Sequence, residues 1–280
     1  YPQTFGYIFI GLVKAGEESG ELEKTLGRIK DLLTKQHNTK TKVLGTLMYP
    51  AFVIVLACVI TLVMLLFVFP TFKTMFEQQE KKLPWMTEMM IAAGDFLKEY
   101  WYTIPIFIIA FVIFCFVMYN WRPAREVLDR TLLKIPLLNN LIMYSNYSNF
   151  MSVVSVSYDA GIPVVDCLHL GLITLTNTVL NNKISTAVTK VSQGLQVSQA
   201  LKSTKVMPKM LLFMVATGEQ TGRLGDMLEK AVNFLDKTLD NIIDTVTKMI
   251  EPIMLLVIGS IVLVMALALY LPLFQSYMSN

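Results

Sequence analysis

The chain has 280 residues, of which 54% are hydrophobic and only 16% are charged. An ordinary soluble domain carries about 25% charged residues, so part of this chain must lie in lipid. The net charge of +3 gives no basis for a nucleic-acid partner.

Three long segments of the sequence contain no Asp, Glu, Lys or Arg. A helix needs about 20 apolar residues to cross the hydrocarbon of a bilayer, and each segment supplies them. The alternative, three core helices of a large soluble protein, fits such a low charge poorly. We therefore predict transmembrane helices at residues 50–70, 101–120 and 252–271.

The distribution of Lys and Arg predicts the orientation of these helices. Residues 1–49 carry seven such side chains and 121–251 carry thirteen, whereas 71–100 carry four and 272–280 none. By the positive-inside rule the two basic segments are cytoplasmic helical domains. The other two are then a periplasmic loop and a periplasmic tail.

Two copies of one motif predict an internal repeat. Residues 13–22 resemble residues 215–224 at an offset of 202, and the same offset brings Pro50 onto Pro252. Each copy would be a cytoplasmic helical bundle followed by a membrane helix, with the helix at 101–120 linking them. Residue 1 aligns with residue 203 and is not Met, so we expect the first domain to be incomplete and the natural protein to be about sixty residues longer.

The helical pattern of the second copy is the easier one to follow. Glycine and proline at 160–163 separate two helices, and residues 218–222 form a turn in which glycines adopt positive φ. From Arg223 onward, three-four spacing of apolar residues predicts a long amphipathic helix that enters the membrane. No segment has a strand pattern, so the class is all-α. Helices are expected at residues 144–158, 164–177, 181–194, 195–203 and 208–217.

The first copy departs from this pattern in a polar stretch at residues 36–42. An exposed helix that faces a partner and a solvated helix end explain the stretch equally well.

The repeat marks ten positions as a candidate structural and coupling motif. Glu17 and Glu219 would accept backbone N–H bonds at the turn, or alternatively contact a partner directly. The glycines serve backbone geometry, and the two border prolines either set the angle between cytoplasmic and membrane helix or are simply tolerated near a helix start. The ten positions are Gly16, Glu17, Gly20, Leu22, Pro50, Gly218, Glu219, Gly222, Leu224 and Pro252.

Sequence motifs of catalysis are missing. The chain has no P-loop, no Gly-x-Ser-x-Gly, no His-Glu-x-x-His and no Cys-x-x-Cys. The predicted membrane helices contain no ionisable Asp, Glu, Lys, Arg or His, which ion and proton pathways normally require. We therefore expect neither an enzyme nor a secondary transporter, and no cofactor or metal. The cysteines and histidines are isolated and are interpreted as packing or surface residues, namely Cys58, Cys115, Cys167, His37 and His169.

The ordered set of motifs resembles the GspF/PilC family of platform proteins. Gly-Glu-x-x-Gly-x-Leu occurs in both halves, Tyr-Pro-Ala begins at Tyr49, and Glu-Pro begins at Glu251. Ile-Pro-Leu at 135–137 and Ala-Gly-Ile-Pro at 160–163 match the openings of the family's second domain. The resemblance spans nearly the whole chain.

This resemblance implies a multi-pass protein of the bacterial inner membrane that acts in a type IV pilus or type II secretion machine. Its partners would be a hexameric cytoplasmic assembly ATPase, pilin or pseudopilin subunits, and other inner-membrane assembly proteins. A homo-oligomer, a dimer or larger, would suit the motor. A membrane transporter or permease subunit is the alternative, and a passive scaffold that recruits the ATPase without moving is a third reading.

Overall fold

The computed structural model describes most of the chain, and every regular element in the described part is helical. The predicted all-α class is therefore confirmed for these residues. Most of the predicted membrane helix at 101–120 lies outside them. The described residues are 9–13, 16, 17, 20, 22–78, 84–100, 102, 106, 107, 109, 110, 113, 118 and 122–278.

The chain divides into two compact units. Unit 1 comprises Tyr1–Val43 and Tyr119–Val246, and unit 2 comprises Leu44–Met118 and Thr247–Asn280. Two long helices, α2 and α12, each contribute residues to both units, so the border between the units falls within continuous helix.

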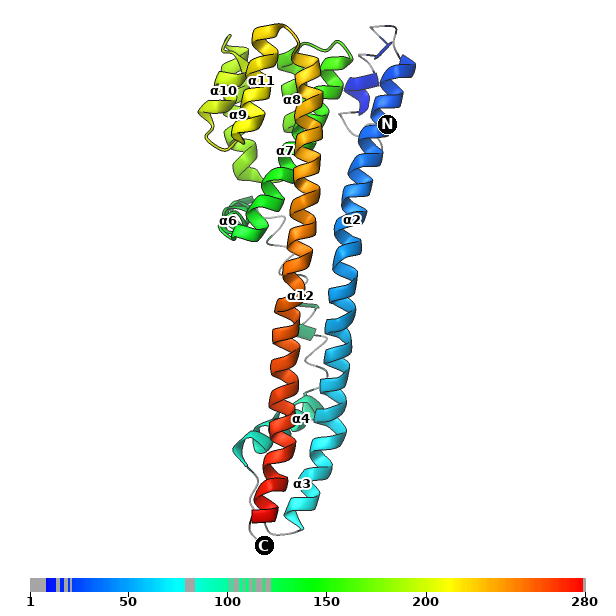
Figure 1. The fold of residues 1–280 in the computed structure, drawn as a ribbon, viewed down its shortest axis with the longest axis vertical. Helices are drawn as coiled ribbons and strands as arrows, with labels where there is room; N and C mark the ends of the chain where they lie inside the picture. Colours follow the sequence, from blue (N-terminus) through cyan, green and yellow to red (C-terminus); the bar gives the residue numbers. More distant parts are fainter. Residues whose placement is uncertain are drawn as a thin grey trace. The chain divides into compact units, whose positions relative to one another are not determined.

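Unit 1 is a helical bundle in which the shorter helices gather around the first turns of α12 (Figure 1). Its core is a single cluster of buried aliphatic and aromatic side chains, including Phe150, Leu168, Ile184, Leu211 and Leu235. Each side chain of this kind stabilises the fold by about 1.5–3 kcal/mol when fully buried. The helices are α6 (Arg122–Leu132), α7 (Pro136–Asp159), α8 (Val164–Leu172), α9 (Thr178–Ser192), α10 (Val197–Ser203) and α11 (Lys209–Thr221), with the first parts of α2 (Leu22–Val63) and α12 (Leu224–Met278).

The connection between α7 and α8 follows the glycine and proline of the sequence. Gly161 has a φ of 83°, a conformation that L side chains rarely adopt, and Pro163 precedes the first turn of α8. The next helix boundary differs from the expected one. Helix α8 ends at Leu172 and α9 begins at Thr178. The start of α9 is fixed by Asn177, whose side chain accepts hydrogen bonds from Val179 N and Leu180 N at 3.0 and 3.1 Å.

Unit 2 contains the apolar parts of the two long helices, which begin in unit 1. Helix α2 passes into a short π-helix, η1 (Met64–Val68), and then into α3 (Phe69–Glu77). Leu22–Phe76 and Leu224–Pro272 are each long and apolar enough to cross a membrane, and they contain the predicted helices at 50–70 and 252–271. These two segments indicate a membrane protein.

Two details of unit 2 differ from expectation. Pro50 and Pro252 lie inside α2 and α12 and not near a helix start, because both helices begin far upstream of the apolar segments. The segment 71–100, expected as a loop, consists largely of the end of α3 and of the helix α4 (Trp85–Glu99).

Candidate functional site

The motif of the second copy lies at the junction of α11 and α12, and only part of it forms the turn. Gly218 and Glu219 belong to the last turns of α11, and Gly222 alone is left-handed, with a φ of 69°. The prediction of a turn over 218–222 was therefore wrong at its start. Gly218 is needed for space: a Cβ there would lie 3.0 Å from Leu224 Cα and 3.0 Å from Met227 Cβ, so the glycine lets α11 and α12 approach closely.

Glu219 reaches from α11 to the start of α10. Its Oε1 accepts from Val197 N at 2.6 Å and its Oε2 accepts from Ser198 N at 2.9 Å. The first N–H groups of a helix have no partner within the helix, and a carboxylate there also interacts favourably with the helix dipole. Glu219 therefore caps α10 and ties it to α11, whereas the sequence placed these bonds in the turn itself.

The same local geometry recurs in the first copy. Gly20 has a φ of 72°, close to that of Gly222. A Cβ on Gly16 would lie 3.0 Å from Thr25 Cβ, and the offset of 202 carries Thr25 onto Met227. Glu17 is exposed, and Val197 and Ser198 have no equivalents at that offset within this chain.

The leucines that follow the motif pack differently in the two copies. Leu224 is half-buried and Leu228 is 2% exposed in the bundle core, whereas Leu22 and Leu26 at the equivalent positions are 38% and 43% exposed. The two copies therefore share a turn but not the packing around it.

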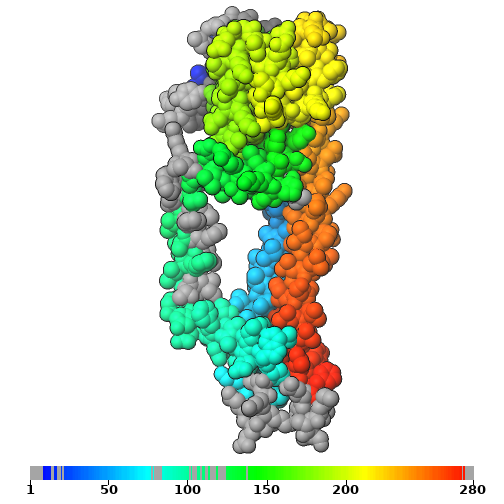
Figure 2. Space-filling view, turned by 90° about the vertical axis from the view of Figure 1, so that its left-hand side faces the viewer, coloured from blue at the N-terminus to red at the C-terminus, as the bar shows by residue number. Residues whose placement is uncertain are grey.

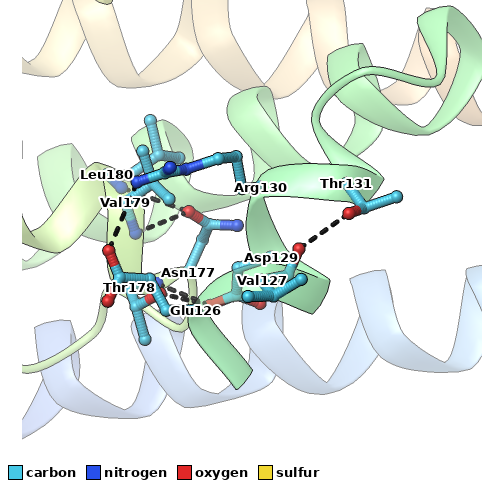
Figure 3. Close-up of polar contacts among 9 residues, drawn as sticks. All are labelled: Glu126, Val127, Asp129, Arg130, Thr131, Asn177, Thr178, Val179 and Leu180. Carbon is cyan, nitrogen blue, oxygen red and sulfur yellow. Dashed lines mark hydrogen bonds and ion pairs between the residues drawn. The ribbon is translucent and has the colours of Figure 1, made fainter. Parts of the chain in front are cut away.

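Polar contacts also connect α6 with α9, as Glu219 connects α10 with α11, and the sequence did not predict them. Asp129 on α6 accepts from both the backbone N and the hydroxyl of Thr178 at 2.8 Å, beside the Asn177 cap (Figure 3). Arg125 Nη2 also donates to the carbonyl of Thr176 at 3.0 Å. The Asn-Thr pair is a recognisable helix start, but nothing near Asp129 in the sequence identifies its distant partner.

A polar seam joins α2 to α12 and α7 within unit 1. Lys35 Nζ lies 2.7 Å from Asp236 Oδ2 and 2.5 Å from Ser152 Oγ. Asp236 also accepts from Ser148 Oγ at 2.6 Å, and Arg28 pairs with Asp159 at 3.4 Å. The seam brings together residues that are far apart in the sequence.

The seam continues along α2 into the polar stretch at 36–42. Lys42 Nζ lies 2.8 Å from Asp240 and 3.2 Å from Asp244, and its hydrogen bond to Asp240 raises the pKa of Lys42 above its usual value of 10.5. The stretch is thus inside a continuous helix and not at a helix end, and its lysine faces α12.

The polar groups of this site form contacts between helices. Within the residues that the structure describes, no group of three or more His, Cys, Asp and Glu side chains could hold a metal. Burial raises the pKa of the Cys167 thiol to about 12, so the reactive thiolate is scarce at neutral pH. The polar groups instead join one helix to another.

Comparisons with known proteins relate the chain to pilus assembly and type II secretion proteins. The family model for type II secretion system protein F matches residues 1–70 and 150–272. Type IV pilus assembly protein PilC of Pseudomonas aeruginosa is 33% identical over 276 residues, which are 98% of this chain and 74% of that protein. TapC, a type IV pilus assembly protein of Aeromonas hydrophila, is 33% identical over 98% of this chain and 67% of its own length. Type II secretion system protein F of Aeromonas hydrophila is 27% identical over 98% and 71%.

Proposed function

Since the chain belongs to the type II secretion system protein F family, we propose that it is the inner-membrane platform of a type IV pilus or type II secretion machine. In this role it couples a cytoplasmic assembly ATPase to the extraction and polymerisation of pilin or pseudopilin subunits. The names of its relatives support the assembly role. The helices themselves support the coupling.

One observation carries the coupling. Helix α12 is continuous over 55 residues, from Leu224 beside the bundle turn to Met278, and it includes the apolar segment that is long enough to cross a membrane. A helix is stiffer than a loop, so a rotation or shift at one end of α12 reaches the other, although Pro252 and Pro272 each lack the N–H of one helical hydrogen bond. The first copy repeats this design, because α2 also runs from the motif into an apolar segment.

The contacts between α10, α11 and α12 would also transmit movement to α12. Glu219 holds α10 on α11, the helix that leads into α12 through Gly222. A partner that pushes on α10 or α11 would thus act on the start of α12. The ATPase would dock on the cytoplasmic bundle, and the apolar segments would receive the subunits in the bilayer.

Charge reversal of Glu219 tests this proposal. In Glu219→Lys, a cation faces the partial positive charge of the α10 N-terminus, which is unfavourable. We expect the variant to insert into the membrane at normal levels but to lose pilus assembly or secretion and to lose co-purification with the ATPase. Lys183→Glu, a charge reversal at an exposed position inside α9 of the same bundle and away from any helix N-terminus, is the matched control and should remain active. Normal assembly by Glu219→Lys would refute the role of the α10–α11 joint.

A second experiment separates a moving platform from a passive scaffold. Crosslinks between cysteines on the bundle and the ATPase should change with the nucleotide that the ATPase holds. A crosslinking pattern that is the same in every nucleotide state would contradict coupling and leave recruitment alone.

A further inference from the structure

Helix α4 has three distinct faces: one is buried, one is apolar and exposed, and one is acidic. It spans Trp85–Glu99, and its 15 residues are about 22 Å long, which is too short to cross the hydrocarbon of about 30 Å. Its position in unit 2 is set by close contacts with the two apolar segments. In Figure 2, α3 and α4 (cyan) lie against the last turns of α12 (red).

One face of α4 is buried against the ends of the apolar segments. Thr87 Oγ1 donates to the carbonyl of Ala268 in α12 at 2.6 Å, and this bond is buried. A Cβ on Gly94 would lie 2.5 Å from the Leu65 carbonyl of η1, so only glycine allows this approach. Ile91 lies in the same cluster with Leu65 and Ala268. These contacts hold α4 at the level of residues 65–69 and 268.

A second face is apolar and uncovered. Trp85, Met89, Ala92 and Phe96 follow one another at intervals of four, three and four residues, so they form one stripe along the helix. Trp85 is 66% and Phe96 60% exposed. Tyr100 extends the stripe, with its ring centroid 4.9 Å from that of Phe96.

A third face is acidic. Glu88, Asp95 and Glu99 are exposed at intervals of seven and four residues, and Asp95 pairs with Lys73 of α3 at 3.2 Å. Apolar and acidic stripes thus run side by side on one short helix. A helix with an apolar face beside a charged face can lie at a membrane–water interface, where tryptophan and tyrosine are enriched.

We propose that α4 is an interfacial membrane helix, with its Trp85–Phe96 stripe in the lipid of one leaflet and its acidic stripe in water. The helix would thereby fix the depth at which the ends of α3 and α12 leave the bilayer. The proposal depends on the membrane location of the apolar segments and not on any ATPase, so it can fail or succeed independently of the platform role.

The position of α4 in the chain favours lipid over a protein partner as the occupant of the stripe. The membrane helix predicted from the sequence at 101–120 begins directly after α4 ends at Glu99, and in that prediction the chain reaches the membrane border there. The neighbouring turns of the apolar segments expose aromatic side chains as well: Phe67 is 68%, Tyr270 60% and Phe274 66% exposed. The stripe therefore resembles the exposed aromatic and apolar surfaces of the neighbouring apolar segments, which would face hydrocarbon.

Two cysteines on the same helix test which stripe faces water. In a full-length variant with Cys58, Cys115 and Cys167 replaced by alanine, Ala92→Cys is placed on the apolar stripe and Glu88→Cys on the acidic one. Vesicles are sonicated with a charged maleimide so that it reaches both membrane faces. We expect the Ala92→Cys thiol to be labelled about tenfold more slowly, because a thiol in apolar surroundings is rarely ionised. Both thiols should be labelled equally after unfolding.

A second measurement distinguishes lipid from a protein that covers the stripe. The chain has three tryptophans, so Trp101→Phe with Trp121→Phe leaves Trp85 as the single fluorophore. Purified protein is placed in vesicles of phosphatidylcholine brominated near the top of the acyl chains, and we expect Trp85 to be quenched by the bromine but not by aqueous iodide.

Three outcomes would overturn the proposal. Equal labelling of both thiols in the vesicles would place the apolar stripe in water. Protection of the Ala92→Cys thiol without bromine quenching of Trp85 would show that a second copy of the chain covers the stripe. Protection of both thiols would bury α4 entirely and exclude an interfacial position.

Discussion

At the scale of single residues, Gly218 and Gly222 show that one amino-acid type serves two purposes four positions apart. Gly222 is required for its left-handed backbone, whereas Gly218 is helical and is required because Leu224 and Met227 approach it closely. The first copy repeats both roles at Gly16 and Gly20. The doubled motif is therefore a pattern for joining two helices at short distance.

The two glycines should respond differently to substitution. Gly222→Ala forces a Cβ into left-handed backbone and should lower the free energy of unfolding by about 1–2 kcal/mol, and Gly222→Asn should lower it less, because asparagine tolerates that conformation. Gly218→Ala should lower it by about 1–3 kcal/mol through overpacking, and Gly218→Asn by at least as much. Thermal unfolding in detergent, followed by circular dichroism, measures both series. If asparagine is no milder than alanine at position 222, or is clearly milder than alanine at position 218, the two roles assigned to these glycines are wrong.

At the scale of helices, ion pairs accompany apolar contacts at the seam between α2 and α12 in unit 1. Lys35 and Asp236 are each less than a third exposed, and each has an additional hydroxyl partner. Ile29 and Leu32 of α2 are buried, at 3% and 6% exposure, whereas Leu26 and Leu33 are exposed. The attachment of α2 to the bundle should therefore depend in part on ionic strength.

A double-mutant cycle on Lys35→Met and Asp236→Asn tests the seam. We expect a coupling energy near 1 kcal/mol at low salt, the upper end for partly exposed pairs, and a clear decrease in 1 M NaCl. The control pair is Arg130–Glu126, which is more exposed, spaced four residues apart on α6 and separated by 3.4 Å. Its coupling should be about 0.3–0.5 kcal/mol. A seam coupling no larger than that of the control would refute a structural role for the seam.

At the scale of the whole molecule, the border between the two units lies inside two continuous helices and not in a flexible linker. The border falls at Val43–Leu44 in α2 and at Val246–Thr247 in α12. Domains are usually separated by flexible segments in which few contacts cross, whereas here the border lies inside two helices, as the proposed coupling requires.

An insertion at the border tests that communication. Four residues, Gly-Ser-Gly-Ser, inserted between Val246 and Thr247 should leave both units folded and the protein in the membrane, but should abolish pilus assembly or secretion because the linker absorbs the movement of α12. Seven helix-forming residues at the same place are the control, since they turn the helix by only about 20° from its original facing and should preserve part of the activity. Full activity with the flexible insertion, measured by complementation of a deletion strain, would exclude coupling through α12.

The sequence by itself determined the local features of this protein. Three-four spacing of apolar residues predicted the all-α class, the break at 160–163 followed from glycine and proline, and the apolar segments around 50–70 and 252–271 followed from the absence of charge. Each of these depends on neighbours along the chain, where backbone preference and solubility decide the outcome. The motif was identified in another way, because residues 13–22 and 215–224 resemble each other at an offset of 202.

Only the tertiary structure decided which distant groups meet. Glu219 caps a helix start 22 residues earlier, and Lys35 meets an aspartate on a helix that begins almost two hundred positions later. Gly218 was assigned to a turn because glycine is common both in turns and at close helix contacts, and sequence does not distinguish the two. Periodicity predicts which face of a helix is buried, but the partner of that face depends on how the helices pack, and packing is a property of the whole fold.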